Sequence, residues 1–163
     1  MRNRCVIAFA FGTPETIQSN RTIALIASNK ARKLNIPVYT QRDIRVDRGV
    51  WAVYTDEEIG NPPPTLRIAR EGVKWAKAHN FTEMWVAAAK PHLWRTMRDV
   101  REAVREAGAK IEVRECEEIE QYPKDSWFCA DSTQERVCSR EAWEKREKWL
   151  KRMPFWIYKH IAK

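Results

Sequence analysis

Glycine is scarce in this sequence of 163 residues, and its 5 glycines stand far apart along the chain. They occupy positions 12, 49, 60, 72 and 108, so no two are closer than 11 residues. The dinucleotide-binding pattern G-x-G-x-x-G, the P-loop and the G-x-S-x-G nucleophile turn all need closer glycines, because each depends on a tight turn or a close backbone approach. The sequence therefore excludes these three motifs as the source of its chemistry.

Metal-binding patterns are missing as well. The 4 cysteines (Cys5, Cys116, Cys129 and Cys138) include no C-x-x-C pair, and the 3 histidines form no H-E-x-x-H. Because zinc sites use closely spaced pairs of ligands, we expect no metal site. The sequence carries no export signal, so we expect reduced thiols, although Cys129 and Cys138 flank a polar loop and would be able to pair if oxidised.

Long hydrophobic runs are also absent. The longest, residues 5–11, is much shorter than the roughly 18–20 residues of a membrane-spanning helix, and it lacks the cleavage pattern of a signal peptide. A hydrophobic content of 44% is nevertheless too high for a disordered chain. We therefore expect one soluble, cytoplasmic domain over residues 1–163.

Hydrophobic periodicity predicts strands and helices in alternation. The expected strands are 5–11, 36–40, 84–89 and 111–113. The expected helices are 19–34, 65–79, 91–107 and a long one from about 139 that Pro154 interrupts. Ser19 or Asn20 is expected to cap the first helix, and Thr65 the second. Asn35, Asn80 and Gly108 are placed to end the first three helices. Such alternation requires crossover connections, and hence a mostly parallel sheet covered on both faces. We predict a three-layer α/β/α, Rossmann-like fold with at least four strands.

The longest connections all follow strands. In an open parallel sheet, ligands bind outside the carboxyl ends of the strands. The segments that leave those ends are 12–19, 41–64, 90–92 and 114–138, and two of them are much longer than usual. The helix-to-strand connections are minimal, so we expect a ligand site at the carboxyl ends of the strands.

Cations gather on this side of the predicted sheet. Arg21, Arg67 and Arg95 lie in the first turns of three helices, where the helix dipole favours anions over cations. Each arginine alone is equally typical of a solvated surface, but together they favour an anionic ligand between them. The expected ligand-binding residues are Gly12, Thr13, Arg21, Thr40, Thr65, Arg67, Lys90 and Arg95.

Two residues are candidates for proton transfer. His92, at a helix N-terminus, should have a lowered pKa and suits a neutral donor or a general base; the alternative is an ordinary neighbour of the helix cap. Glu15 suits a general base or a metal contact, or else a first-turn glutamate that interacts with the helix dipole. The sequence indicates no particular cofactor.

The order of several motifs resembles the YdcF/SanA/ElyC-like domain family, an α/β domain of unknown function found mainly in bacteria. The matching features, spread over residues 5–160, are Gly12 after the first strand, Arg21, Pro64-Thr65, the His92-x-x-Arg95 motif after an apolar strand, and Gly108. Thr40-Gln41-Arg42 departs from the family's Ser-Gly-Gly, and the family's Thr-x-x-Asn has no asparagine after Thr65. The resemblance implies a divergent, anchor-free member and names no reaction.

Three functions remain open. The leading one is binding of an anionic small molecule, such as a nucleotide or another phosphorylated or carboxylated metabolite, with or without catalysis. A net charge of +8 and 8 tryptophans also suit a nucleic-acid-binding protein. Against this, glutamates alternate with the basic residues of the last helices, which is typical of a solvated, salt-bridged face. The third is a non-catalytic interaction module.

The aromatic residues near the C-terminus bear on that third function. The group Phe155, Trp156 and Tyr158 suits either an oligomer interface or the last part of the core. The other tryptophans in or beside apolar helix stripes are expected in the core, and they are Trp75, Trp94, Trp143 and Trp149.

Overall fold

The computed structural model describes residues 3–60 and 63–162. Its five strands are all parallel and form one sheet in the order β3-β2-β1-β4-β5. They are β1 (Arg4–Ala8), β2 (Val38–Thr40), β3 (Ala52–Tyr54), β4 (Glu83–Ala87) and β5 (Glu112–Glu115). In the register of the central strand, Ile7 lies opposite Tyr39 on one side and Val86 on the other.

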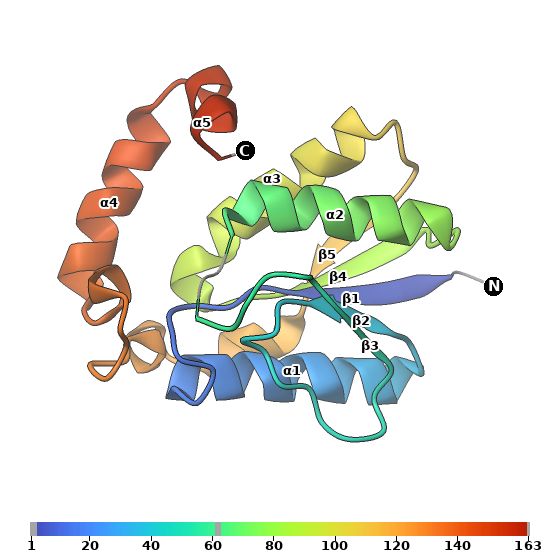
Figure 1. Ribbon diagram of the computed structural model, residues 1–163, viewed down its shortest axis with the longest axis horizontal. Helices are drawn as coiled ribbons and strands as arrows, with labels where there is room; N and C mark the ends of the chain where they lie inside the picture. Colours follow the sequence, from blue (N-terminus) through green and yellow to red (C-terminus); the bar gives the residue numbers. More distant parts are fainter. Residues whose placement is uncertain (1–2, 61–62, 163) are drawn as a thin grey trace.

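Helices cover both faces of this sheet, as Figure 1 shows. The helix α1 (Gln18–Leu34) lies on one face, and α2 (Thr65–Ala78) and α3 (Lys90–Glu106) lie side by side on the other. Two 3-10 helices, η1 (Glu117–Gln121) and η2 (Lys124–Trp127), follow β5 on the α1 side, where Lys30 of α1 binds Glu117. The predicted three-layer α/β/α fold is confirmed.

The C-terminal segment forms the edge of the molecule at which the strands end (Figure 1). It consists of η3 (Glu135–Val137), α4 (Arg140–Arg152) and α5 (Phe155–Ile161). Ser139 caps α4 by accepting a hydrogen bond from the Ala142 backbone N–H at 3.3 Å, and Pro154 separates α4 from α5 as expected. We call residues 135–162 the C-terminal segment below.

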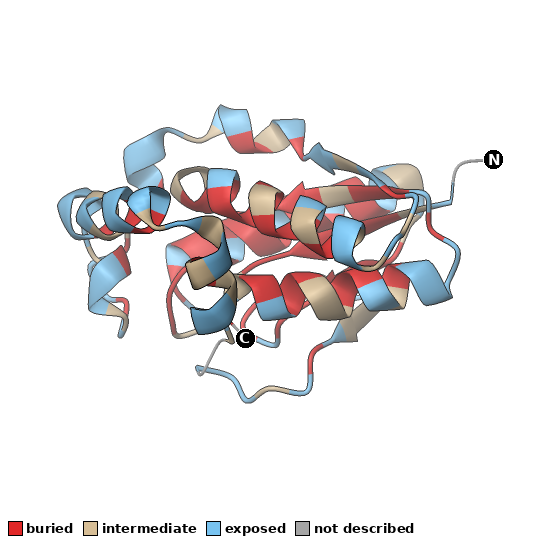
Figure 2. Cartoon of the chain, turned by 90° about the horizontal axis from the view of Figure 1, so that it is seen from above, coloured by how far each residue is buried: buried red, intermediate tan, exposed pale blue. Residues whose placement is uncertain are grey.

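The core lies between the sheet and its two helical layers, so the three central strands are mostly buried while the outer helix faces are exposed (Figure 2). Residues 5–8 of the central strand are all buried, in agreement with their continuous apolar sequence. Gly72 lets α2 approach this strand closely, since a Cβ atom there would lie 2.5 Å from Cδ1 of Ile7 and 3.1 Å from the Tyr39 ring.

The predicted helix ends are confirmed, but two helix starts differ from expectation. Asn35, Asn80 and Gly108 adopt left-handed φ angles of 52°, 58° and 55°. The helix α1 begins at Gln18, and neither Ser19 nor Asn20 caps it. Both side chains instead bind the preceding loop: Ser19 donates to the carbonyl of Phe11 at 2.8 Å, and the Asn20 amide also binds this loop. Likewise, α2 begins at Thr65 itself, so that Thr65 is not its cap.

Other expectations were wrong or incomplete. The segment 41–64 contains the short, partly exposed strand β3, and its residues 61–62 lie outside the described residues. Trp94 and Trp149 are 48% and 61% exposed, so they do not belong to the core.

All four cysteines are free. Of the described helices, none has the length and apolar character to cross a membrane.

Candidate functional site

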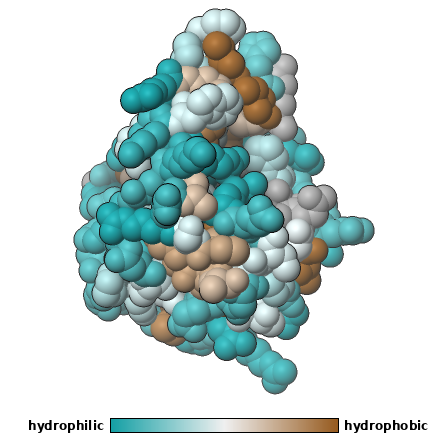
Figure 3. All heavy atoms as spheres, turned by 90° about the vertical axis from the view of Figure 1, so that its left-hand side faces the viewer, coloured by the Kyte–Doolittle hydropathy of each residue, from teal (hydrophilic) through white to brown (hydrophobic). Residues whose placement is uncertain are grey.

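A cavity of about 290 Å³ lies at the carboxyl ends of β1, β2 and β4. The segment that follows β1 (residues 9–12), Gln41 after β2, and the first turns of α2 and α3 form one wall. The C-terminal segment forms the opposite wall. The chain passes from β1 to β2 on one side, while β4 lies on the other, so the cavity sits where the strand order reverses. Figure 3 faces this edge, whose surface is largely hydrophilic.

Three arginines line the cavity: Arg95 of α3, Arg136 of η3 and Arg146 of α4. Arg95 is only 6% exposed, and its Nη2 lies 3.3 Å from Oε1 of Glu147, which is itself 7% exposed. Its guanidinium carbon lies 5.2 Å from the centre of the Trp143 ring. Arg136 and Arg146 form no ion pair with any residue in 3–60 or 63–162. Three guanidinium groups therefore face one carboxylate.

The pKa values of these groups reflect this imbalance. Burial lowers the pKa of Arg146 to about 10, and the nearby charges of Arg136 and Arg95 contribute to the same shift. Arg136 is exposed, but partial desolvation by the surrounding protein lowers its pKa as well, again with a contribution from Arg95. The pKa of Glu147 is raised by burial, although Arg95 and Arg146 oppose this. The described residues therefore leave the cavity with a net positive charge.

His92 faces the same cavity and is neutral. It is 5% exposed, and burial, followed by the charge of Arg95, lowers its pKa well below the usual value. Its Nε2 lies 3.2 Å from Oγ1 of Thr65, and its ring packs edge-on against Trp143 at 5.5 Å. Its buried Nδ1 has no hydrogen-bond partner within the described part of the chain. A neutral imidazole with a free ring nitrogen is able to bind a polar ligand atom or to accept or donate a proton.

Four of the ten residues predicted from the sequence line this cavity, namely Gly12, Thr65, His92 and Arg95. Gly12 has a φ of +92°, and a Cβ atom there would lie 2.7 Å from Cγ2 of Val137. The backbone at this position therefore packs directly against the C-terminal segment.

The other six lie elsewhere. The Thr13 hydroxyl pairs with the Thr133 hydroxyl, and the Thr40 hydroxyl donates to the carbonyl of Ala8 at 3.0 Å, so both are buried structural contacts. Arg21 is exposed. The three remaining residues form ion pairs outside the cavity: Arg67 with Glu57 at 3.0 Å, Lys90 with Glu120 at 2.6 Å, and Glu15 with Arg45 at 2.7 Å. The structure does not bring these six to the cavity.

Sequence reasoning missed most of the wall formed by the C-terminal segment. The alternating charges of residues 140–148 indicated a solvated face, which is wrong for Glu147 and incomplete for Arg146. A signal was available, because Trp143 and Leu150 lie one turn before and after these two residues on the same side of α4 and are both buried. Gln41, Gln134, Arg136 and Tyr158 also line the cavity and were not predicted.

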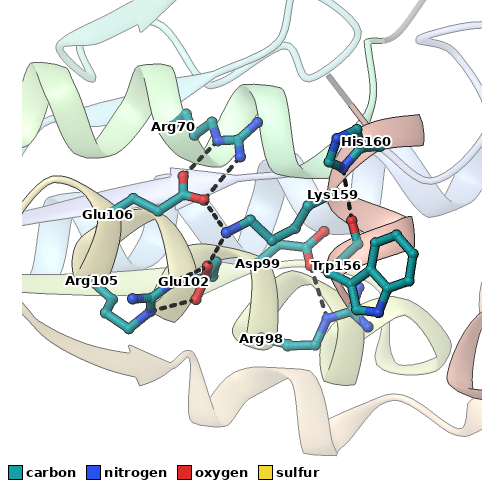
Figure 4. A network of polar contacts seen from close by, with 9 residues as sticks. All are labelled: Arg70, Arg98, Asp99, Glu102, Arg105, Glu106, Trp156, Lys159 and His160. Atoms are coloured by element: carbon teal, nitrogen blue, oxygen red, sulfur yellow. Dashed lines mark hydrogen bonds and ion pairs between the residues drawn. The ribbon is translucent and has the colours of Figure 1, made fainter. Parts of the chain in front are cut away.

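Ion pairs attach α5 to α3 and so position the cavity wall (Figure 4). Nζ of Lys159 lies 2.6 Å from Glu102 and 2.7 Å from Glu106, and Glu106 also binds Arg70 of α2. The Arg70 contact is the main reason that the pKa of Glu106 falls to about 2. The neighbouring Tyr158 hydroxyl binds the buried carboxylate of Asp99.

The structure also places the C-terminal aromatic group. Tyr158 is buried and stacks on Phe155, with ring centres 5.8 Å apart, while Trp156 is exposed. The group is therefore part of a packed helix rather than one continuous exposed patch. Among the described residues, no cluster of three or more His, Cys, Asp or Glu side chains is arranged to hold a metal ion.

The chain matches no family model and no curated protein. Several solved structures are similar to part of it, among them a reductase and a universal stress protein. The NADPH complex of leucoanthocyanidin reductase from Vitis vinifera is 15% identical with a TM-score of 0.40, over 66% of this chain and 32% of the reductase. The universal stress protein from Archaeoglobus fulgidus, in complex with dAMP, is 14% identical with a TM-score of 0.36, over 71% of this chain and 98% of that protein. This chain thus spans about a third of the reductase.

Proposed function

We propose that this protein binds an anionic small molecule, such as a nucleotide or another phosphorylated or carboxylated metabolite, in the cavity at the carboxyl ends of the strands. The observation that carries the proposal is the convergence of Arg95, Arg136 and Arg146 on one cavity, where Glu147, beside Arg95, is the one carboxylate that pairs with any of the three within residues 3–60 and 63–162. Arg95 is buried, Arg146 is half-buried and Arg136 is exposed. Three cations close together with one carboxylate partner repel one another, so such a cluster is typical of a site that binds an anion.

The wall formed by the edge of the sheet supplies neutral hydrogen-bonding groups for the rest of the ligand. Gln41 uses its Oε1 to accept the Ala10 backbone N–H at 2.7 Å, so its amide nitrogen remains a donor. Thr65 and His92 add a hydroxyl and a neutral imidazole. If the protein is an enzyme, His92 is the group placed to transfer a proton.

The proposed membership of the YdcF/SanA/ElyC-like family is supported by the order of its motifs. His92 and Arg95, which carry the most specific of those motifs, are neighbours in the cavity. This proposal concerns ancestry and adds no reaction to the one above.

A thermal-shift panel at near-physiological salt tests the binding proposal. It contains mononucleotides, sugar phosphates, dicarboxylates and a short single-stranded oligonucleotide. A ligand at about 100 times its dissociation constant should stabilise the fold by about 2.7 kcal/mol. We expect stabilisation by at least one small anion, its loss in Arg136→Gln and Arg146→Gln, and its retention in Arg101→Gln. Arg101 is the matched control because it is exposed on α3 and does not line the cavity.

Two results would contradict the proposal. The first is stabilisation by the oligonucleotide alone that disappears as salt is added, because counterion release then accounts for the binding. The second is binding of a small anion that is equally strong in all three variants, because the ligand would then bind outside this cavity.

A further inference from the structure

The charge balance of the cavity also indicates which class of anion would bind there. Arg95, Arg136 and Arg146 supply three positive charges, and Glu147 supplies one negative charge. A second buried carboxylate, Asp99, also interacts with the charge of Arg95, but it is bound to Arg98 at 2.9 Å and to the Tyr158 hydroxyl, so its own charge is already paired. A ligand with one negative charge would leave one guanidinium unbalanced, whereas a ligand with two would balance them all.

Hydrogen bonding gives a second, independent indication. Nε of Arg95 is buried and has no hydrogen-bond partner in the described part of the chain, and the same holds for Oε1 of Glu147. The two side chains form an ion pair at 3.3 Å, but their geometry does not make a hydrogen bond. Buried charged groups are almost always hydrogen-bonded in native proteins. The free donor edge of Arg95 therefore points to a ligand that brings its own acceptor atoms.

Guanidinium groups suit one ligand chemistry in particular. A phosphate monoester concentrates up to two negative charges and three strong acceptor oxygens at one end, and arginine forks bind such oxygens in pairs. The three arginines come from separate elements, α3, η3 and α4, so they approach a bound group from different directions. The two charges of a dicarboxylate lie at opposite ends and match this convergence less well.

We infer that the cavity binds the dianionic form of a phosphate monoester, with its phosphate held by Arg95, Arg136 and Arg146. This inference rests on the proposed function and narrows its class of ligand. The charged and titratable groups at the cavity are these three arginines, His92 of α3 and Tyr158 of α5, which line it, and Glu147 of α4, which lies beside Arg95.

Methyl phosphate and methyl sulfate form a matched pair of probes for this inference. They have nearly the same shape, but methyl sulfate stays a monoanion while methyl phosphate gains its second charge above about pH 6. We expect methyl phosphate to bind at least about tenfold more tightly at pH 8, measured by calorimetry on the full chain. At pH 5 this preference should disappear. Protonation of His92 or Glu147 changes the binding of both probes, so the ratio of their affinities isolates the charge of the ligand.

Variants and a third probe complete the experiment. Arg136→Gln should lower the ratio at pH 8, whereas Arg101→Gln should leave it unchanged. Equal affinities for the two probes at pH 8 would overturn the dianion inference and leave the proposed function standing. Tighter binding of succinate than of methyl phosphate would overturn it in favour of a dicarboxylate. If neither these probes nor any anion of the thermal-shift panel binds, the proposed function itself is wrong.

Discussion

Replacing Arg146 with methionine should make the ligand-free protein more stable. Burial and the neighbouring arginines lower the Arg146 pKa from its ordinary value to about 10. At about 1.4 kcal/mol per pH unit, this difference corresponds to about 3 kcal/mol of unfavourable free energy for the charged form. The side chain is half-buried, and solvent screening reduces this figure. Methionine keeps much of the apolar stem, so we expect the free energy of unfolding to rise by about 1–2 kcal/mol.

Urea denaturation at pH 7 measures this change, and thermal denaturation provides an independent check. For a chain of this size, each kcal/mol corresponds to about 2–4 °C in Tm. The control is Arg101→Met, on the exposed side of α3, which should change the free energy of unfolding by no more than about 0.5 kcal/mol. The comparison separates the unbalanced charge of the cavity from the general effect of removing an arginine from a basic protein.

Saturation with a bound anion should reverse the order of stabilities. The wild-type protein gains about 2.7 kcal/mol at 100 times the dissociation constant of the ligand, and the variant, having lost part of the site, gains less. A methionine variant that is less stable than the wild type without ligand would refute the reasoning. Arg146 would then be balanced in the free protein, and the cavity would not be poised for an anion.

Three further predictions concern the fold around the site. Below about pH 6.5, the wild type should lose stability relative to His92→Gln by up to about 1.4 kcal/mol per pH unit. The reason is that the pKa of His92 is lowered in the folded protein, so the unfolded chain takes up the proton first. Urea titrations at about pH 5 and pH 7 measure this loss, and an equal difference in stability at both pH values contradicts the prediction. Gly72→Ala should lower the free energy of unfolding by about 1–2 kcal/mol, although alanine has the better helix propensity, because the new Cβ would clash with Ile7. A more stable variant in the same assay would show that α2 moves away easily. Lys159→Met should lower the free energy of unfolding by removing the ion pairs to Glu102 and Glu106, and this loss should shrink at about 1 M salt. A loss independent of salt would point to packing instead.

The sequence predicted the fold well because the relevant signals are local. The continuous apolar run of β1, the left-handed residues Asn35, Asn80 and Gly108, and the order of strands and helices all follow from short-range patterns. The strand β3 was missed because it has three residues and is only partly buried, so neither a long apolar run nor a regular alternation marks it.

The site was predicted only in part, for a physical reason. Gly12 lies in the loop after β1, and Thr65, His92 and Arg95 lie in the first two turns of α2 and α3, so the topology of a parallel sheet brings them together. The remaining residues reach the cavity through the path of the C-terminal segment across that edge. No local pattern specifies such a long-range docking, and an arginine that lines a cavity has the same spacing on a helix as one that faces water.

The two walls of the cavity therefore contribute different chemical groups to ligand binding. The sheet edge contributes Arg95 and the neutral groups of Gln41, Thr65 and His92, on elements that the buried core holds in place. The C-terminal segment contributes Arg136 and Arg146, and with them most of the charge. It is attached to the rest of the molecule partly through ion pairs of α5 that are accessible to solvent. Because a bound anion would contact both walls, its affinity depends on how firmly α5 is attached, and substitutions at Lys159 should weaken binding without touching the ligand.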